Sequence, residues 1–232
     1  MLLFNVWNML KQPTYNYTMD NTNNIIETII EQLCNEKICL LQTDTVFGLI
    51  CRGDSDVATK KIEDIKHREH KAFGYFVRDL KMAEKYVIIN NDKKRQYFQS
   101  VFPGYFTLIF EATDYAIKTM PKNAFGVNKN SKKTLGIRVP KNDFCLQVLN
   151  DERITFPLLA TSANISKQAT PTRYEDIDEE IIKAVDCVYY DNNVNLAGKS
   201  STIIDLSCDN GYNIVREGSG VADHDMLNSL FK

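Results

Sequence analysis

The chain has 232 residues, a formal net charge of -2, 44% hydrophobic residues and 25% charged residues. These values are normal for a soluble globular chain of one large or two small domains, and they give no overall basic field that would draw it to nucleic acid or membrane. No apolar stretch is long enough to span a bilayer, so we expect no membrane partner.

Six cysteines lie at positions 34, 39, 51, 145, 187 and 208, with no CxxC pair and no Cys/His spacing typical of zinc. We interpret them as reduced core residues of a cytoplasmic protein. The N-terminal segment MLLFNVWNMLK is apolar but lacks the basic residues and the small-residue cleavage site of a signal peptide. Residues 1–20 are therefore predicted to be an extension that packs on the surface or frays, followed by one domain over residues 21–232.

The hydrophobic spacing predicts helices and strands in mixed order, without strict βα alternation. In the first half we expect a helix over 23–36, a strand over 38–42, a helix over 55–66 that ends in a cationic cluster, a strand over 74–78, and helices over 79–87 and 92–101. In the second half we expect a turn at 103–104, a strand over 106–111, a mobile surface loop over 113–133, a strand over 134–139, a helix over 142–150, a strand over 157–160, a helix over 177–185, strands over 187–190, 202–206 and 212–215, and a helix over 223–231. This pattern predicts one α/β domain on a mixed twisted sheet.

A polar triplet, Thr43-Asp44-Thr45, interrupts an apolar run between Ile38–Leu41 and Val46–Cys51. Packing alone explains such a triplet poorly. It fits a strand end whose hydroxyls face a ligand. It fits equally well a Ser/Thr or Asx turn, in which the side chains bond the local backbone.

Other polar groups follow the predicted strands and helices, while the usual catalytic signatures are absent and the three histidines supply no triad. Each polar group has an ordinary explanation, such as a cation at a helix C-terminus or a structural ion pair. Together, cations, hydroxyls and an amide are what a phosphate or carboxylate ligand requires. The candidates are Thr43, Lys66, Arg68, Arg138, Ser162, Asn164, Ser201 and Arg216.

Seven segments, in order, resemble the signature of the YrdC family of threonylcarbamoyl-AMP synthases, and together they cover roughly residues 24 to 220. They are QTDTVFGL at 42–49, KHR at 66–68, PGYFT at 103–107, GIRVP at 136–140, TSANIS at 161–166, STIID at 201–205 and REG at 216–218. A single segment of this kind is a weak signal, whereas seven in the family order are a strong one.

The resemblance implies a YrdC-like twisted mixed sheet with flanking helices and a concave cationic pocket. It also implies a cytoplasmic enzyme that condenses L-threonine, bicarbonate and ATP into threonylcarbamoyl-AMP and pyrophosphate, for use by downstream tRNA threonylcarbamoyl transfer proteins. By the same resemblance, Lys66 and Arg68 are the catalytic cations at the phosphates, with Mg²⁺ arriving with ATP and no metal site on the protein. The nucleotide and phosphates are assigned to Ser162, Asn164, Ser201 and Arg216, and threonine to Thr43 and Arg138.

The chain departs from the family pattern at Gln42, Phe47, Glu69, Tyr105 and Ser200, where the family has Pro or Tyr. Glu69 is expected to neutralise part of the pocket's charge. These departures leave a degenerate, inactive homologue as one alternative. A double-stranded RNA-binding module is a second, and a hydrogenase-maturation carbamoyltransferase domain is a third, although those proteins are large and carry zinc fingers. Weak RNA binding is also expected of the enzyme. Because the chain ends shortly after Arg216, we expect the short, single-domain form of the family.

Overall fold

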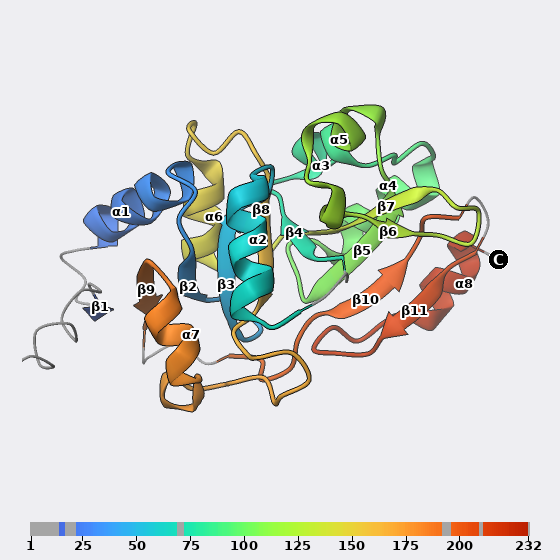
Figure 1. Cartoon of the computed structure of the whole chain (residues 1–232). Helices are drawn as coiled ribbons and strands as arrows, with labels where there is room; N and C mark the ends of the chain where they lie inside the picture. The colour runs from blue at the N-terminus through green and yellow to red at the C-terminus, as the bar shows by residue number, and fades with distance from the viewer. Residues whose placement is uncertain (1–13, 17–21, 69–71, 192–195, 209–210, 232) are drawn as a thin grey trace, which may run out of the picture.

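One twisted sheet runs across the molecule in the computed structural model (Figure 1). The structure describes residues 14–16, 22–68, 72–191, 196–208 and 211–231. Within these residues the strand order is β1-β9-β2-β3-β8-β4-β7-β5-β10-β11, and β6 pairs with β7. The strands are β1 (Thr14–Asn16), β2 (Cys39–Gln42), β3 (Phe47–Arg52), β4 (Gly74–Phe76), β5 (Phe106–Glu111), β6 (Gly126–Val127), β7 (Lys133–Arg138), β8 (Leu158–Ser162), β9 (Cys187–Tyr190), β10 (Thr202–Asp205) and β11 (Asn213–Arg216).

Parallel and antiparallel neighbours are mixed along this sheet. The pairs β1–β9, β2–β9, β4–β7 and β5–β10 are parallel, and the other pairs are antiparallel. The predicted fold class, a mixed twisted α/β sheet with flanking helices, is confirmed.

The helices begin where the sequence supplies capping side chains. Ser55, Asp79, Asn91, Thr113 and Asn142 each accept a backbone N–H of the first helical turn, which satisfies donors that the helix itself leaves unpaired. The helices are α1 (Thr22–Cys34), α2 (Asp56–Ile65), α3 (Leu80–Tyr86), α4 (Asp92–Val101), α5 (Asp114–Thr119), α6 (Asp143–Asn150), α7 (Glu179–Ala184) and α8 (His224–Phe231), with short 3-10 turns at Lys122–Ala124 and Tyr174–Asp176.

Alternating residues of the central strands β2 and β3 face two separate cores. Leu40 and Leu49 belong to a large core that also holds residues of α2, α3, α4, α5, α7 and α8, whereas Leu41 and Ile50 belong to a second core with residues of α1 and α6. Helix α1 contacts β2, β3 and β9, and α6 packs against α1. Among the described residues, these two helices therefore leave β5, β7 and β10 uncovered on this second face. Half of one sheet face is therefore available for a ligand.

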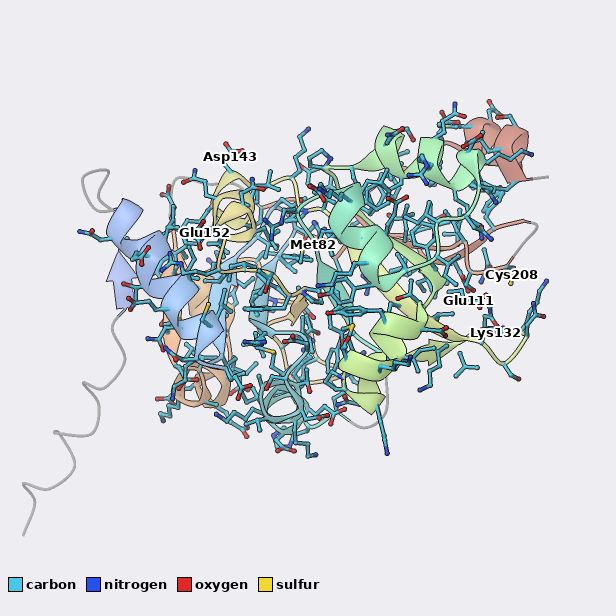
Figure 2. All side chains as sticks on the ribbon, turned by 90° about the horizontal axis from the view of Figure 1, so that it is seen from above. Met82, Glu111, Lys132, Asp143, Glu152 and Cys208 are labelled. Carbon is cyan, nitrogen blue, oxygen red and sulfur yellow. The ribbon has the colours of Figure 1, made fainter. Side chains whose placement is uncertain are left out.

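The expectation of a mobile loop without regular structure over 113–133 is wrong. Thr113 caps α5, Ala116 and Ala124 are buried, and β6 pairs with β7 to form a hairpin. Helix α5 and strand β6 are too short to show a hydrophobic period in the sequence. They are stabilised by the tertiary contacts of a few buried residues. Lys132, in the turn of this hairpin, forms an ion pair with Glu111 of β5 at 3.5 Å (Figure 2).

From the predicted N-terminal extension, β1 pairs with β9 at the edge of the sheet. Other residues of that extension, and Glu69, lie outside the described part of the chain. The six cysteines are free thiols, and four of them are buried. In the described residues, no helix has the length and apolar character needed to cross a membrane.

Candidate functional site

A cavity of about 260 Å³ lies on the half of the sheet that the helices leave open. One cross-strand row forms its floor, in the order Ile50, Ala160, Gly74, Gly136 and Ile109. The three central residues of this row carry a methyl group or no side chain. The floor is therefore peptide backbone between two isoleucines, and the small residues create the concavity.

The opposite faces of the same strands explain why the sequence folds this way. Tyr75, Ile137 and Leu159 alternate with the small floor residues and are fully buried in the large core. Successive side chains of a strand point to opposite faces of the sheet. The bulky residues therefore anchor the sheet in the large core, and the small residues on the other face leave space for the cavity. A Cβ at Gly136 would lie 3.1 Å from the Thr107 methyl carbon, so the floor has little space for larger residues there.

Arg138 lies at the end of β7 with its guanidinium fixed at three points. Nη2 donates to Asp44 Oδ1 at 2.6 Å, Nη1 donates to the Thr45 hydroxyl at 3.0 Å, and Nε donates to the Gly104 carbonyl at 3.3 Å. A guanidinium has five N–H groups, so one hydrogen on each terminal nitrogen remains for a ligand. Both partners of the ion pair are buried, with 6% and 3% of the Arg138 and Asp44 side chains exposed.

The polar triplet before β3 forms a Ser/Thr turn and also lines the cavity. The Thr43 hydroxyl donates to the Val46 carbonyl at 2.7 Å and accepts from the backbone N–H groups of Thr45 and Val46. Thr43 and Thr45 both line the cavity. The two interpretations of this triplet are thus compatible, since local bonding fixes the turn and places it against the cavity.

Two further arginines line the cavity, each held by a backbone carbonyl. Arg68 donates to the Ala72 carbonyl at 2.8 Å and stacks on the Phe73 ring, while its buried Nε has no partner. Arg216 donates to the Ser201 carbonyl at 2.8 and 3.1 Å. Burial lowers the pKa of Arg68, with a further contribution from Arg216, and burial and then Arg138 lower the pKa of Arg216.

Lys66 lies behind the cavity wall rather than in it. Its ammonium donates to the carbonyls of Ser162 and Asn164, at 2.6 Å in the case of Asn164. Burial, and to a smaller extent Arg68, lower the pKa of Lys66 to about 8. Asn164 in turn donates to the carbonyls of Ile165 and Gln168. Lys66 and Asn164 therefore hold the turn that presents Ser162 to the cavity.

On the opposite wall, Ser201 hydrogen-bonds Thr107 through their hydroxyls at 2.7 Å. The segment before Ser201 reaches back to the polar turn, where Ala197 and Gly198 donate to the carbonyls of Asp44 and Thr45. The two halves of the cavity rim are thereby joined.

The lining is cationic and contains no carboxylate among the described residues, and no group of described His, Cys, Asp and Glu side chains could hold a metal ion. Three arginines with several hydroxyls can bind anions through charge-assisted hydrogen bonds.

The sequence model of the Sua5/YciO/YrdC family, which carries the description telomere recombination, matches residues 31–218. The chain belongs to the Sua5/YciO/YrdC family. A putative threonylcarbamoyl-AMP synthase of Methanocaldococcus jannaschii is 32% identical over 205 residues, covering 88% of this chain and 90% of that protein. The threonylcarbamoyl-AMP synthase of Mus musculus is 26% identical over 198 residues, covering 83% of this chain and 66% of the mouse protein.

Two solved structures of the Sua5/YciO/YrdC family share the fold. E. coli YciO matches with a TM-score of 0.72 at 25% identity, over 88% of this chain and 93% of YciO. Sua5 of P. abyssi in complex with L-threonine matches with a TM-score of 0.71 at 22% identity, over 83% of this chain and 54% of Sua5.

Within this family fold, the cavity brings together six of the eight residues that the sequence singled out, and the other two lie directly behind it. The six that line it are Thr43, Arg68, Arg138, Ser162, Ser201 and Arg216. Sequence reasoning missed the floor, because a glycine or alanine carries no chemical signal of its own. The pattern that could have revealed it is the alternation of small and bulky residues along β4, β7 and β8.

Proposed function

We propose that this chain is an L-threonylcarbamoyladenylate synthase, which joins L-threonine, bicarbonate and ATP and releases pyrophosphate and water. The observation that carries the proposal is the set of three arginines around one cavity, on a chain whose relatives include named threonylcarbamoyl-AMP synthases. The Sua5 structure in complex with L-threonine supports threonine as the amino-acid substrate.

In the proposed reaction the threonine amine takes up carbon dioxide from bicarbonate to form a carbamate. A carbamate oxygen then attacks the α-phosphorus of ATP, and the bond to the pyrophosphate oxygen breaks. Such a transfer requires positioning and charge neutralisation more than covalent catalysis. Arg68 and Arg216 would neutralise charge on the phosphates, and Arg138 would orient the threonine carboxylate.

Lys66 and Asn164 take a different part in this proposal from the one that the family signature suggests. Because the Lys66 ammonium donates to the carbonyls of Ser162 and Asn164, it would position the Ser162 hydroxyl and add positive charge from behind the wall. Ser162, whose hydroxyl donates to Asn164 Oδ1 at 2.5 Å, and Ser201 would contact the nucleotide.

Magnesium fits this site as part of the nucleotide. The described lining has hydroxyls and arginines but no carboxylate, so the phosphate oxygens and water would be its main ligands. The ion would supply charge neutralisation at the phosphates when it is bound.

The test is pyrophosphate release from ATP by the purified protein. We expect release only when L-threonine and bicarbonate are both present, and threonylcarbamoyl-AMP as the accompanying product by mass spectrometry. Pyrophosphate release that does not depend on threonine would contradict the proposed function. Salt-sensitive binding of double-stranded RNA without any turnover of ATP would contradict it as well.

A further inference from the structure

The three arginines of the cavity differ in how their charge is compensated. Arg138 forms a buried ion pair with Asp44, whose second carboxylate oxygen accepts the Lys141 backbone N–H at 2.8 Å. Arg68 and Arg216 form no ion pair among the described residues, and their fixed partners are neutral carbonyls. Burial lowers the pKa of Arg68, and the Glu63 carboxylate only partly opposes this lowering.

We infer that Asp44, which does not itself line the cavity, divides it into two subsites. By compensating most of the charge of Arg138 through the ion pair, it makes that residue a directional carboxylate site, and it leaves Arg68 and Arg216, which have no ion-pair partner among the described residues, as the polyphosphate site. This inference rests on the proposed function, because it assigns the two substrates of that reaction to the two sides of one cavity.

The physical reason for such a division is that charge and direction are separable properties. A triphosphate carries several negative charges and is attracted to net positive charge, whereas an amino acid is a zwitterion whose carboxylate gains mainly from two aligned N–H donors. Arg138 keeps two free N–H groups, but its positive charge is largely compensated by Asp44. Arg68 and Arg216 have net charge, and the buried Arg68 Nε is a donor still without a partner.

Asp44 also fixes where the Arg138 donors point. With Thr45 and Gly104 it holds the guanidinium at three of its nitrogen atoms. An arginine side chain held in this way loses little further rotational freedom when a carboxylate binds. Asp44 is thus a positioning residue, because it acts on the ligand only through Arg138.

The test uses isothermal titration of the full chain with L-threonine and, separately, with inorganic pyrophosphate. In Asp44→Asn, which keeps the side-chain shape, we expect threonine affinity to fall on the order of tenfold or more, since Arg138 loses its charged anchor. Pyrophosphate affinity should stay equal or rise in the same variant, because Arg138 becomes an uncompensated cation. A structural defect would weaken both ligands, so opposite responses identify the role.

Two variants complete the design. Arg68→Ala should reverse the pattern, with pyrophosphate affinity reduced on the order of tenfold or more and threonine affinity close to that of the parent. Asp54→Asn is the matched control, since Asp54 forms a similar ion pair with Arg52 at 2.6 Å outside the cavity, and neither affinity should change.

If Asp44→Asn does not fold, Thr45→Val keeps the Asp44 charge and removes one anchor of Arg138. It should lower threonine affinity without any gain for pyrophosphate. Equal losses for both ligands in Asp44→Asn, or a gain for pyrophosphate in Thr45→Val, would overturn the inference.

A parent protein that binds pyrophosphate and another amino acid, but not threonine, would contradict threonine as the proposed substrate and would still support the division of the cavity into two subsites. A parent that binds no amino acid would overturn both.

Discussion

Arg68 and His67 are neighbours in the chain, yet only Arg68 faces the cavity. His67 contacts Glu180 at 2.9 Å and has a backbone φ of 47°. We expect Arg68→Ala to reduce pyrophosphate release on the order of a hundredfold or more, because a fixed cation contributes most where charge develops in the transition state.

His67→Asn is the matched control for Arg68→Ala, since asparagine accepts a left-handed backbone conformation better than alanine does. It should keep a rate close to the parent. Near-parental turnover in a folded Arg68→Ala protein would show that the catalytic cation lies elsewhere.

The buried ammonium of Lys66 predicts a pH dependence of the free energy of unfolding. Its pKa is about 8 in the folded chain, below the ordinary lysine value, so between these values the unfolded chain binds more protons than the folded one. The free energy of unfolding of the parent, relative to Lys66→Met, should therefore rise with pH through this window, by up to about 3 kcal/mol. Urea unfolding of both proteins at several pH values measures it, and a constant difference would indicate a normal lysine pKa.

At the scale of the strands, substitutions at two glycines are expected to have different effects, one on the stability of the fold and the other on ligand binding. A Cβ at Gly53 would lie 2.5 Å from the Pro157 carbonyl oxygen, whereas a Cβ at Gly74 would have only ordinary contacts, the nearest at 3.7 Å. We expect Gly53→Ala to lower the free energy of unfolding by about 2 kcal/mol. Gly74→Ala should melt within a few degrees of the parent and bind ATP more weakly, because its methyl group fills the cavity floor.

Helix α5 offers a test of the region whose structure the sequence did not predict. The Thr113 hydroxyl accepts the Ala116 N–H and donates to the Lys85 carbonyl at 2.8 Å. Thr113→Ala should lower the free energy of unfolding by about 1–2 kcal/mol, through loss of the cap. Thr119→Ala, in the last turn of the same helix, should change it by less than about 0.5 kcal/mol, and equal effects would contradict a capping role.

For the whole molecule, the sequence predicted what depends on local periodicity and on recognisable motifs. The helices with long apolar faces, such as α1, and the strands with continuous apolar runs, such as β2, follow the predicted ranges. The sequence also allowed a structural ion pair as the ordinary explanation for a charged candidate such as Arg138. It did not identify Asp44 as the partner of Arg138, because the two residues lie 94 positions apart and only the strand order of the folded sheet brings them together.

The position of Lys66 illustrates the same limit within the candidate site. A motif places Lys66 and Arg68 together, but the backbone that follows α2 directs the Lys66 side chain into the protein and the Arg68 side chain toward the cavity. Spacing in the sequence predicted that the two residues are neighbours. The direction of each side chain depends on the carbonyls that surround it, which no local pattern encodes.

The grouping of Arg68, Arg138 and Arg216 has a consequence for the lifetime of the protein. Without a bound anion, burial and mutual repulsion make the charged forms of Arg68 and Arg216 costly, and an anion acts as their missing counter-ion. A ligand at a hundredfold its Kd adds about 2.7 kcal/mol to stability. We expect Arg216→Gln to melt higher than the parent without ligand, and to gain less from pyrophosphate. Under the proposed function that anion is a nucleotide, and a good supply of nucleotide would then lengthen the lifetime of the protein in the cell.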